Sequence, residues 1–155
     1  MLREVLFLVC SFLVLLGTSQ NWNNFNTPAA TDCNASIALP VNSTITINNE
    51  PIADGDIIGV FYNNGAELFL GGLITWTGSA ESIAAWGSEA GANNGFQVGE
   101  EYIWYVYDVD TEQSIIASNV QMLLGENTYA CNGLSAVSVL NFLSVGCSDP
   151  SACNY

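Results

Sequence analysis

In this chain of 155 residues, fifteen side chains are acidic and one is basic, which gives a formal net charge of −14. Such a surface cannot neutralise nucleic-acid phosphates and is repelled by anionic membranes. The chain has no histidine, and its single cation, Arg3, lies in the leader described next. We therefore expect no catalytic triad, Cys–His pair, Schiff-base lysine or histidine-ligated zinc, and no enzyme activity. Calcium binding by oxygen ligands remains open, and no other cofactor is expected.

The first residues have the pattern of a secretory signal peptide. Arg3 precedes an apolar run from Val5 to Leu16, and small or polar residues follow as far as Ser19. The run is shorter than the roughly 20 apolar residues of a transmembrane helix. We predict a signal-peptide helix over residues 1–19, cleavage after Ser19, no membrane insertion after cleavage, and a secreted or cell-surface protein.

An Asn-rich segment, residues 20–32, follows the leader and is predicted to be a linker. From there to residue 143, short β-branched and aromatic runs alternate with Gly, Asn, Asp and Pro, and no stretch keeps a helical period. Turns are expected at Asn48–Pro51 and Asn63–Gly65. We predict an all-β fold, a single antiparallel β-sandwich of jelly-roll or immunoglobulin type over residues 33–143. The predicted strands are residues 36–39, 44–47, 57–62, 68–76, 82–86, 102–107, 114–120 and 137–142.

The predicted strand Tyr102–Tyr107 has no polar residue at alternate positions. A half-exposed strand alternates, as in Thr44–Ile47, where both Ile face one side and both Thr the other. Either the protein covers both faces of residues 102–107, which we favour, or one face presents aromatic side chains to a partner.

Four cysteines follow the leader, namely Cys33, Cys131, Cys147 and Cys153. In an exported chain they are disulfide candidates rather than metal ligands, and the sequence leaves every pairing open. A bridge between Cys33 and Cys131 would close a loop around the body of the domain, which contributes roughly 4 to 5 kcal/mol in the chain-entropy model.

Asp108, Asp110 and Glu112 are spaced two apart. On an extended backbone their carboxylates would share one face and could bind calcium. The segment lies between two predicted strands and lacks the glycine and distal glutamate of a calcium-binding hand, so an ordinary hairpin turn is the favoured interpretation.

Asp54 and Asp56 flank Gly55 just before a β-branched run. They could hold a metal ion or form an acid–base pair. Carboxylates so close in sequence rarely reach the separation of ~5 Å or more that glycosidases need. A tight turn that enters a strand is therefore the favoured interpretation.

Trp76, Trp86, Phe96 and Trp104 are the candidates for ligand binding. Large aromatics in a small β domain usually lie in the core. They are also side chains that binding surfaces favour, so a platform for stacking sugar rings is the alternative.

The chain contains an ordered set of short motifs, namely residues 45–52, the stretch "GDIIGVFYNNG" at 55–65, and residues 71–78, 83–87 and 94–100. Together they resemble a module that recurs in secreted proteins of Bacteroidetes. The resemblance covers most of residues 33–142 and implies a β-sandwich within a large multidomain surface or secreted protein, often one with a type IX secretion sorting domain. It implies no biochemical activity.

The tail, residues 144–155, contains a segment from Gly146 to Tyr155 that resembles the start of a second element of such proteins, "GC-T/S-DP-x-A-x-NY". The chain stops where that element would continue, which implies a truncated repeat and a longer protein. Some members of the module carry a cysteine where this chain has Phe69-Leu70, and the resemblance therefore favours Cys33–Cys131 as the domain disulfide.

From these observations we expect a non-catalytic adhesion or binding module of a larger secreted or cell-surface protein. Its partner would be an extracellular glycan or a protein surface, contacted by the loops Asn63–Glu67, Ser88–Asn94 and Asp108–Gln113. The alternatives are a calcium-assisted carbohydrate-binding module, which would use the aromatics and the carboxylates of residues 108–112, and a structural spacer without a ligand.

Overall fold

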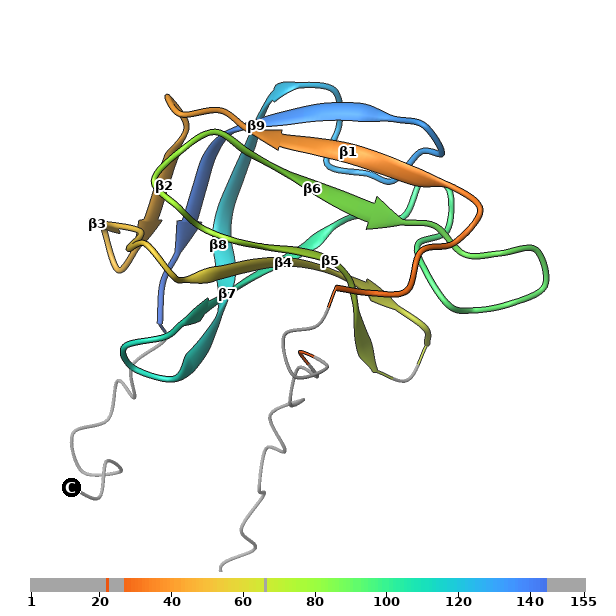
Figure 1. Cartoon of the computed structure of the whole chain (residues 1–155), viewed down its shortest axis with the longest axis horizontal. Helices are drawn as coiled ribbons and strands as arrows, with labels where there is room; N and C mark the ends of the chain where they lie inside the picture. The colour runs from red at the N-terminus through yellow and green to blue at the C-terminus, as the bar shows by residue number, and fades with distance from the viewer. Residues whose placement is uncertain (1–21, 23–26, 66, 145–155) are drawn as a thin grey trace, which may run out of the picture.

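The computed structural model describes residues 22, 27–65 and 67–144, and these residues form an all-β fold (Figure 1). The predicted all-β class is confirmed, and all the predicted strands are present. The leader and nearly all of the tail lie outside the described residues, so the predictions made for them stay predictions. The strands are β1 (Asn34–Leu39), β2 (Thr44–Ile47), β3 (Glu50–Pro51), β4 (Ile57–Asn63), β5 (Leu68–Thr75), β6 (Glu81–Trp86), β7 (Ile103–Asp108), β8 (Gln113–Leu124) and β9 (Leu134–Phe142).

The strands are hydrogen-bonded in the order β3-β2-β9-β8-β7-β4-β5, and β1 pairs with both β6 and β9. The long strand β8 joins the two halves of this arrangement. Its residues 113–116 pair with β7, and its residues 117–124 pair with β9. The chain thus passes from one group of strands to the other within a single strand.

The sheet is mixed, so the prediction of a purely antiparallel sheet is wrong. The last strand, β9, is parallel to β1 through Ser36–Ala38 and parallel to β2 through Thr44–Ile47. Between β1 and β2 the chain makes a short turn, in which the Ser43 amide donates to the Pro40 carbonyl at 2.9 Å. Both strands therefore run in one direction along β9. Parallel neighbours need a long connection, and here the whole intervening chain supplies it.

The inner core lies between the two groups of strands. Side chains of β1, β6 and β9 meet those of β4 and β7 in one apolar cluster, and β5 comes close to β6 because Gly72 has no side chain. A Cβ at Gly72 would lie 2.4 Å from the Ala84 carbonyl oxygen. Each fully buried aliphatic or aromatic side chain contributes about 1.5–3 kcal/mol. Fully buried members of this inner core are Ile37, Leu39, Ile58, Val60, Ile83, Trp104, Val106, Val137, Leu140 and Phe142.

A second apolar cluster, which we call the outer cluster, covers the opposite face of β4, β5 and β7. It contains Trp22, Ile57, Phe61, Leu70 and Tyr105. Strand β7 accordingly points its residues 104 and 106 into the inner core and its residue 105 into the outer cluster. The favoured interpretation, that the protein covers both faces of this strand, is confirmed.

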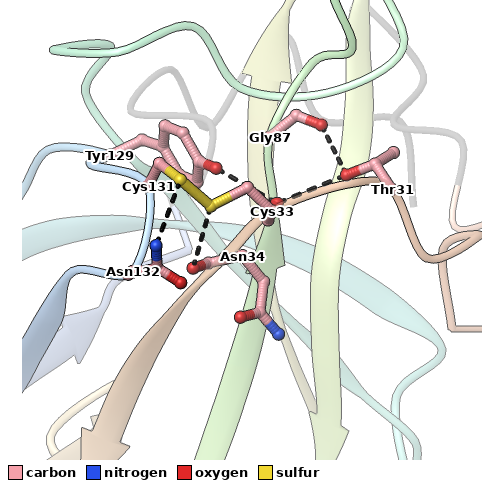
Figure 2. The surroundings of a disulfide bond; sticks show 7 residues. All are labelled: Thr31, Cys33, Asn34, Gly87, Tyr129, Cys131 and Asn132. Atoms are coloured by element: carbon pink, nitrogen blue, oxygen red, sulfur yellow. Dashed lines mark hydrogen bonds between the residues drawn. A yellow bond between two sulfur atoms is a disulfide. The ribbon is translucent and has the colours of Figure 1, made fainter.

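A disulfide links Cys33, just before β1, to Cys131, just before β9 (Figure 2). The two Cα atoms are 5.6 Å apart and the residues are 98 positions apart in sequence. The Tyr129 hydroxyl donates to the Cys33 carbonyl at 3.1 Å, and the Thr31 hydroxyl donates to the Gly87 carbonyl at 2.7 Å. The pairing that the resemblance favoured is thus present, and it joins the first and last long strands at one end of the fold.

Candidate binding surface

The aromatic side chains predicted as a stacking platform do not form one, because the fold buries three of the four. Phe96 and Trp104 are each 1% exposed, and Trp76 is 8% exposed. Phe96 packs edge-on against Tyr102, with ring centroids 5.0 Å apart. Large rings stabilise a small β domain most when they are buried, and these three do so. Of the four candidates, Trp86 in β6 is half-buried and keeps a partly accessible ring.

The three carboxylates predicted as calcium ligands, Asp108, Asp110 and Glu112, lie on a turn. Asp108 Oδ1 accepts hydrogen bonds from the backbone amides of Asp110 at 3.0 Å and Thr111 at 3.1 Å, and Glu112 has a φ of 55°. The backbone is therefore not extended, and alternate side chains do not share one face. Among the described residues, no group of three acidic, cysteine or histidine side chains could hold a metal ion. The favoured turn is confirmed, and the calcium ligand set stays a prediction.

Asp56 is a buried carboxylate, only 2% exposed, that fastens two loops. Its Oδ2 accepts from the Ala53 amide at 3.0 Å, and its Oδ1 accepts from the Val109 amide at 3.1 Å. Asp54, by contrast, is exposed. The favoured turn at the start of β4 is confirmed, and the sequence did not predict that Asp56 also fixes the loop between β7 and β8.

Two of the three predicted contact loops touch each other. The Asn93 side-chain amide donates to the Asn64 carbonyl at 3.0 Å, which joins the loop 88–94 to the loop 63–67. The third loop, 108–113, is the β7–β8 hairpin. The hydrogen bond from the Val109 amide to Asp56 links it to the start of β4. Most of the described residues of the three loops are exposed.

A hollow of about 400 Å³ opens where β8 leaves β7. Pairing between the two strands ends at Ile116, because the rest of β8 continues along β9 instead. The separation of the strands leaves a gap that side chains only partly fill. It is lined by Glu101, Tyr102, Ile103, Trp104, residues 116–120 and Asn127.

One wall of the hollow is a preorganised hydrogen-bond chain. The Trp104 indole donates to Asn127 Oδ1 at 2.8 Å, and Asn127 Nδ2 donates both to Glu101 Oε1 at 3.2 Å and to the Tyr102 carbonyl at 3.3 Å. Asn127 is thereby fixed in orientation by three partners. It holds the Glu101 carboxylate, which is exposed and is the one charged side chain among the lining residues.

Other residues that line the hollow combine apolar and polar groups. Ile116 is 45% exposed although it belongs to a strand, and Ile103 is half-buried. Ser118 and Asn119 follow on the same strand as Ile116, and both are exposed. A hollow with an apolar surface and a few converging hydrogen-bonding groups is the usual composition of a ligand site.

Tyr102, which lines the hollow, and its neighbour Tyr129 are uncharged at neutral pH. Burial, with a smaller contribution from the neighbouring Tyr129, raises the pKa of Tyr102 to about 12. Burial also raises the pKa of Tyr129 above its ordinary value. The charge at the hollow therefore comes from Glu101 and not from these tyrosines.

The sequence pattern predicted Trp104 as a ligand-binding residue, but it predicted none of the accessible residues that line this hollow. Glu101, Asn119 and Asn127 come from separate segments, and only the transfer of β8 from β7 to β9 brings them together. Ile116 is exposed, and no local pattern in the sequence distinguishes it from a buried strand residue.

No protein-family model matches the chain, and no curated protein or solved structure matches it either. In the part of the chain that the structure describes, no helix is both long and apolar enough to cross a membrane.

Proposed function

We propose that this chain is a non-catalytic extracellular binding module of β-sandwich architecture, and that its ligand site is the hollow between β7 and β8. The proposal includes the setting that the sequence resemblance implies, a larger secreted or surface protein of the Bacteroidetes kind. The disulfide supports the extracellular setting, since such bonds persist in oxidising compartments. The two clusters on either side of β4 and β7 support a rigid scaffold.

The ligand class that fits best is a neutral, hydroxyl-rich molecule such as a glycan. The observation that carries this proposal is that the hydrogen-bonded pair Glu101–Asn127 and the exposed Ile116 line the same hollow. The hydroxyl groups of a sugar ring could bond to Glu101 and Asn127, and the apolar face of the ring could pack on Ile116. Anionic ligands are disfavoured because the whole protein carries a formal charge of −14.

A glycan array probed with the protein, followed by titration of the best ligand, tests this proposal. Glu101→Gln keeps the size of the side chain but removes its charge, and we expect it to weaken binding by roughly 10-fold, as for a charged hydrogen bond. The matched control is Glu50→Gln on the exposed strand β3, which does not line the hollow. Equal affinities of the two variants would contradict the assignment of the site.

The same titration separates the alternatives. None of the proposed ligand contacts involves calcium, so the affinity for the glycan should be unchanged by a calcium chelator. Loss of binding on chelation would favour the calcium-assisted carbohydrate-binding module instead. Absence of binding to every glycan and to candidate protein partners would favour the structural spacer.

A further inference from the structure

The outer cluster contains a side chain that does not belong to any strand. Trp22 lies before β1 in the sequence, yet it is only 7% exposed. Its ring meets Phe61 edge-on at a centroid distance of 5.0 Å and Tyr107 at 6.2 Å. Its indole N–H donates to the Ser114 hydroxyl at 2.8 Å. Among the described residues of the predicted linker, Trp22 is thus the one whose side chain joins the outer cluster over β4, β5 and β7.

Strand β4 has a glycine, Gly59, where the Trp22 ring packs against it. Gly59 lies in the middle of β4, where a glycine costs about 0.5–1 kcal/mol relative to alanine. A Cβ at Gly59 would stand 2.7 Å from Cζ3 of Trp22, closer than real atoms approach. The missing side chain therefore makes a depression in the sheet that the six-membered ring occupies. Figure 1 shows the central place of β4, whose neighbours are β5 and β7.

The depression is selective for an indole. Its apolar walls, Phe61 and Leu70, would accept any hydrophobic group, and the Ser114 hydroxyl adds an acceptor at the position that the indole N–H reaches. A flat bicyclic ring that carries one donor meets both requirements, whereas leucine or phenylalanine meets only the first. We call this set, Gly59, Phe61, Leu70, Tyr107 and Ser114, the indole socket.

We propose that the indole socket is a docking site for the Trp22 side chain of a second copy, which would take the place that Trp22 of the same chain occupies in this structure. The outer cluster is separate from the inner core, so emptying the socket leaves the main core intact. Exchange of an identical element between copies uses the same contacts and needs no new surface. The predicted cleavage after Ser19 would leave Trp22 close to a free chain end, where exchange is easiest. Two strongly acidic copies repel each other, and exchange should therefore increase with salt.

A peptide with the sequence of residues 20–27, QNWNNFNT, tests the socket. Trp22→Ala protein, whose socket is empty, should bind this peptide, and the same peptide with alanine in place of tryptophan should not bind. Wild-type protein should bind at least about tenfold more weakly, since its own Trp22 competes. Ser114→Ala in the Trp22→Ala background should weaken peptide binding roughly fivefold through loss of one hydrogen bond.

Failure of Trp22→Ala protein to distinguish the two peptides would overturn the socket. This peptide test changes only Trp22 and Ser114, so it still decides the question if Gly59→Val prevents folding.

A pair of complementary variants tests the second-copy occupant. Gly59→Val blocks the socket but keeps Trp22, and Trp22→Ala keeps the socket but lacks the ring. Each variant alone should sediment as a monomer, and an equimolar mixture should form heterodimers, more of them at high salt. If the mixture stays monomeric at all salt concentrations although the peptide binds, docking from a second copy is overturned. Glycan binding, measured separately, should be unchanged in both variants.

Discussion

The inner core draws side chains from β1, β2, β4, β6, β7, β8 and β9, whereas the outer cluster is completed by one residue from before the first strand. The inner core is enclosed by strand pairing between distant parts of the chain and by the disulfide. Among the described residues, the outer cluster has one member from outside the strands, Trp22, which contacts Phe61 and donates to the Ser114 hydroxyl. From this difference we expect that the inner core determines the fold, and that the Trp22 ring can leave the outer cluster without unfolding the protein.

The largest expected effect comes from breaking the disulfide beside the inner core. Replacing both Cys33 and Cys131 by serine should lower the free energy of unfolding by about 4–5 kcal/mol for a loop of this length. Urea denaturation followed by circular dichroism measures it. A loss below about 1 kcal/mol would mean that pairing between β1 and β9 alone holds this end.

Truncating a ring in the inner core should be nearly as damaging. Phe142 is fully buried on β9, and Phe142→Ala should cost roughly 3–5 kcal/mol through lost burial and the cavity left behind. The midpoint of thermal unfolding reports this loss. The outer cluster provides the comparison, because Trp22→Ala leaves an open surface rather than a closed cavity and should cost less.

A smaller effect is expected at Asp56, which lies at the start of β4, the strand shared by both clusters. Asp56→Ala leaves the amides of Ala53 and Val109 without their acceptor and should cost about 1–3 kcal/mol. Asp54→Ala is the matched control, since that side chain is exposed. Equal destabilisation by the two variants would contradict the role given to Asp56.

The smallest effect concerns alkaline pH and is confined to the inner core. The pKa of Tyr102 is raised from its ordinary value of 10.0 to about 12, so the unfolded chain loses this proton at lower pH than the folded one. The resulting stability is complete below pH 10 and is lost as the pH rises towards 12. Melting temperatures should fall across this window, and the slope should be shallower in Tyr102→Phe. An unchanged slope in that variant would assign the alkaline loss to other groups.

The sequence predicted the all-β class because alternation and turn residues are local signals. Asn48 and Asn49, both with positive φ, form the expected tight turn after β2. The ends of β8 and the start of β9 were missed. Register shifts between Ala117 and Asn119 and again near Met122 break the alternation, and Leu123 and Leu124 are exposed rather than buried. Local patterns cannot predict a strand whose period is interrupted.

The parallel pairing of β9 and the hollow at Ile116 depend on which strands become neighbours, and no local pattern encodes that choice. The aromatic candidates failed for a related reason, since composition cannot show which face of a strand a ring occupies. For the indole socket a signal did exist. Gly59 interrupts an otherwise bulky strand, and a glycine in a strand interior often marks a close approach by another group.

The central claim, that one ring closes a separate outer site, is tested most directly by dye binding to Trp22→Ala protein. We predict a single cooperative melt with the wild-type far-ultraviolet signal, together with new fluorescence of an apolar-surface dye that the QNWNNFNT peptide displaces. Loss of the folded signal would show that Trp22 is part of the main core. Absence of dye binding would show that the outer face closes without it, and either result would contradict the account.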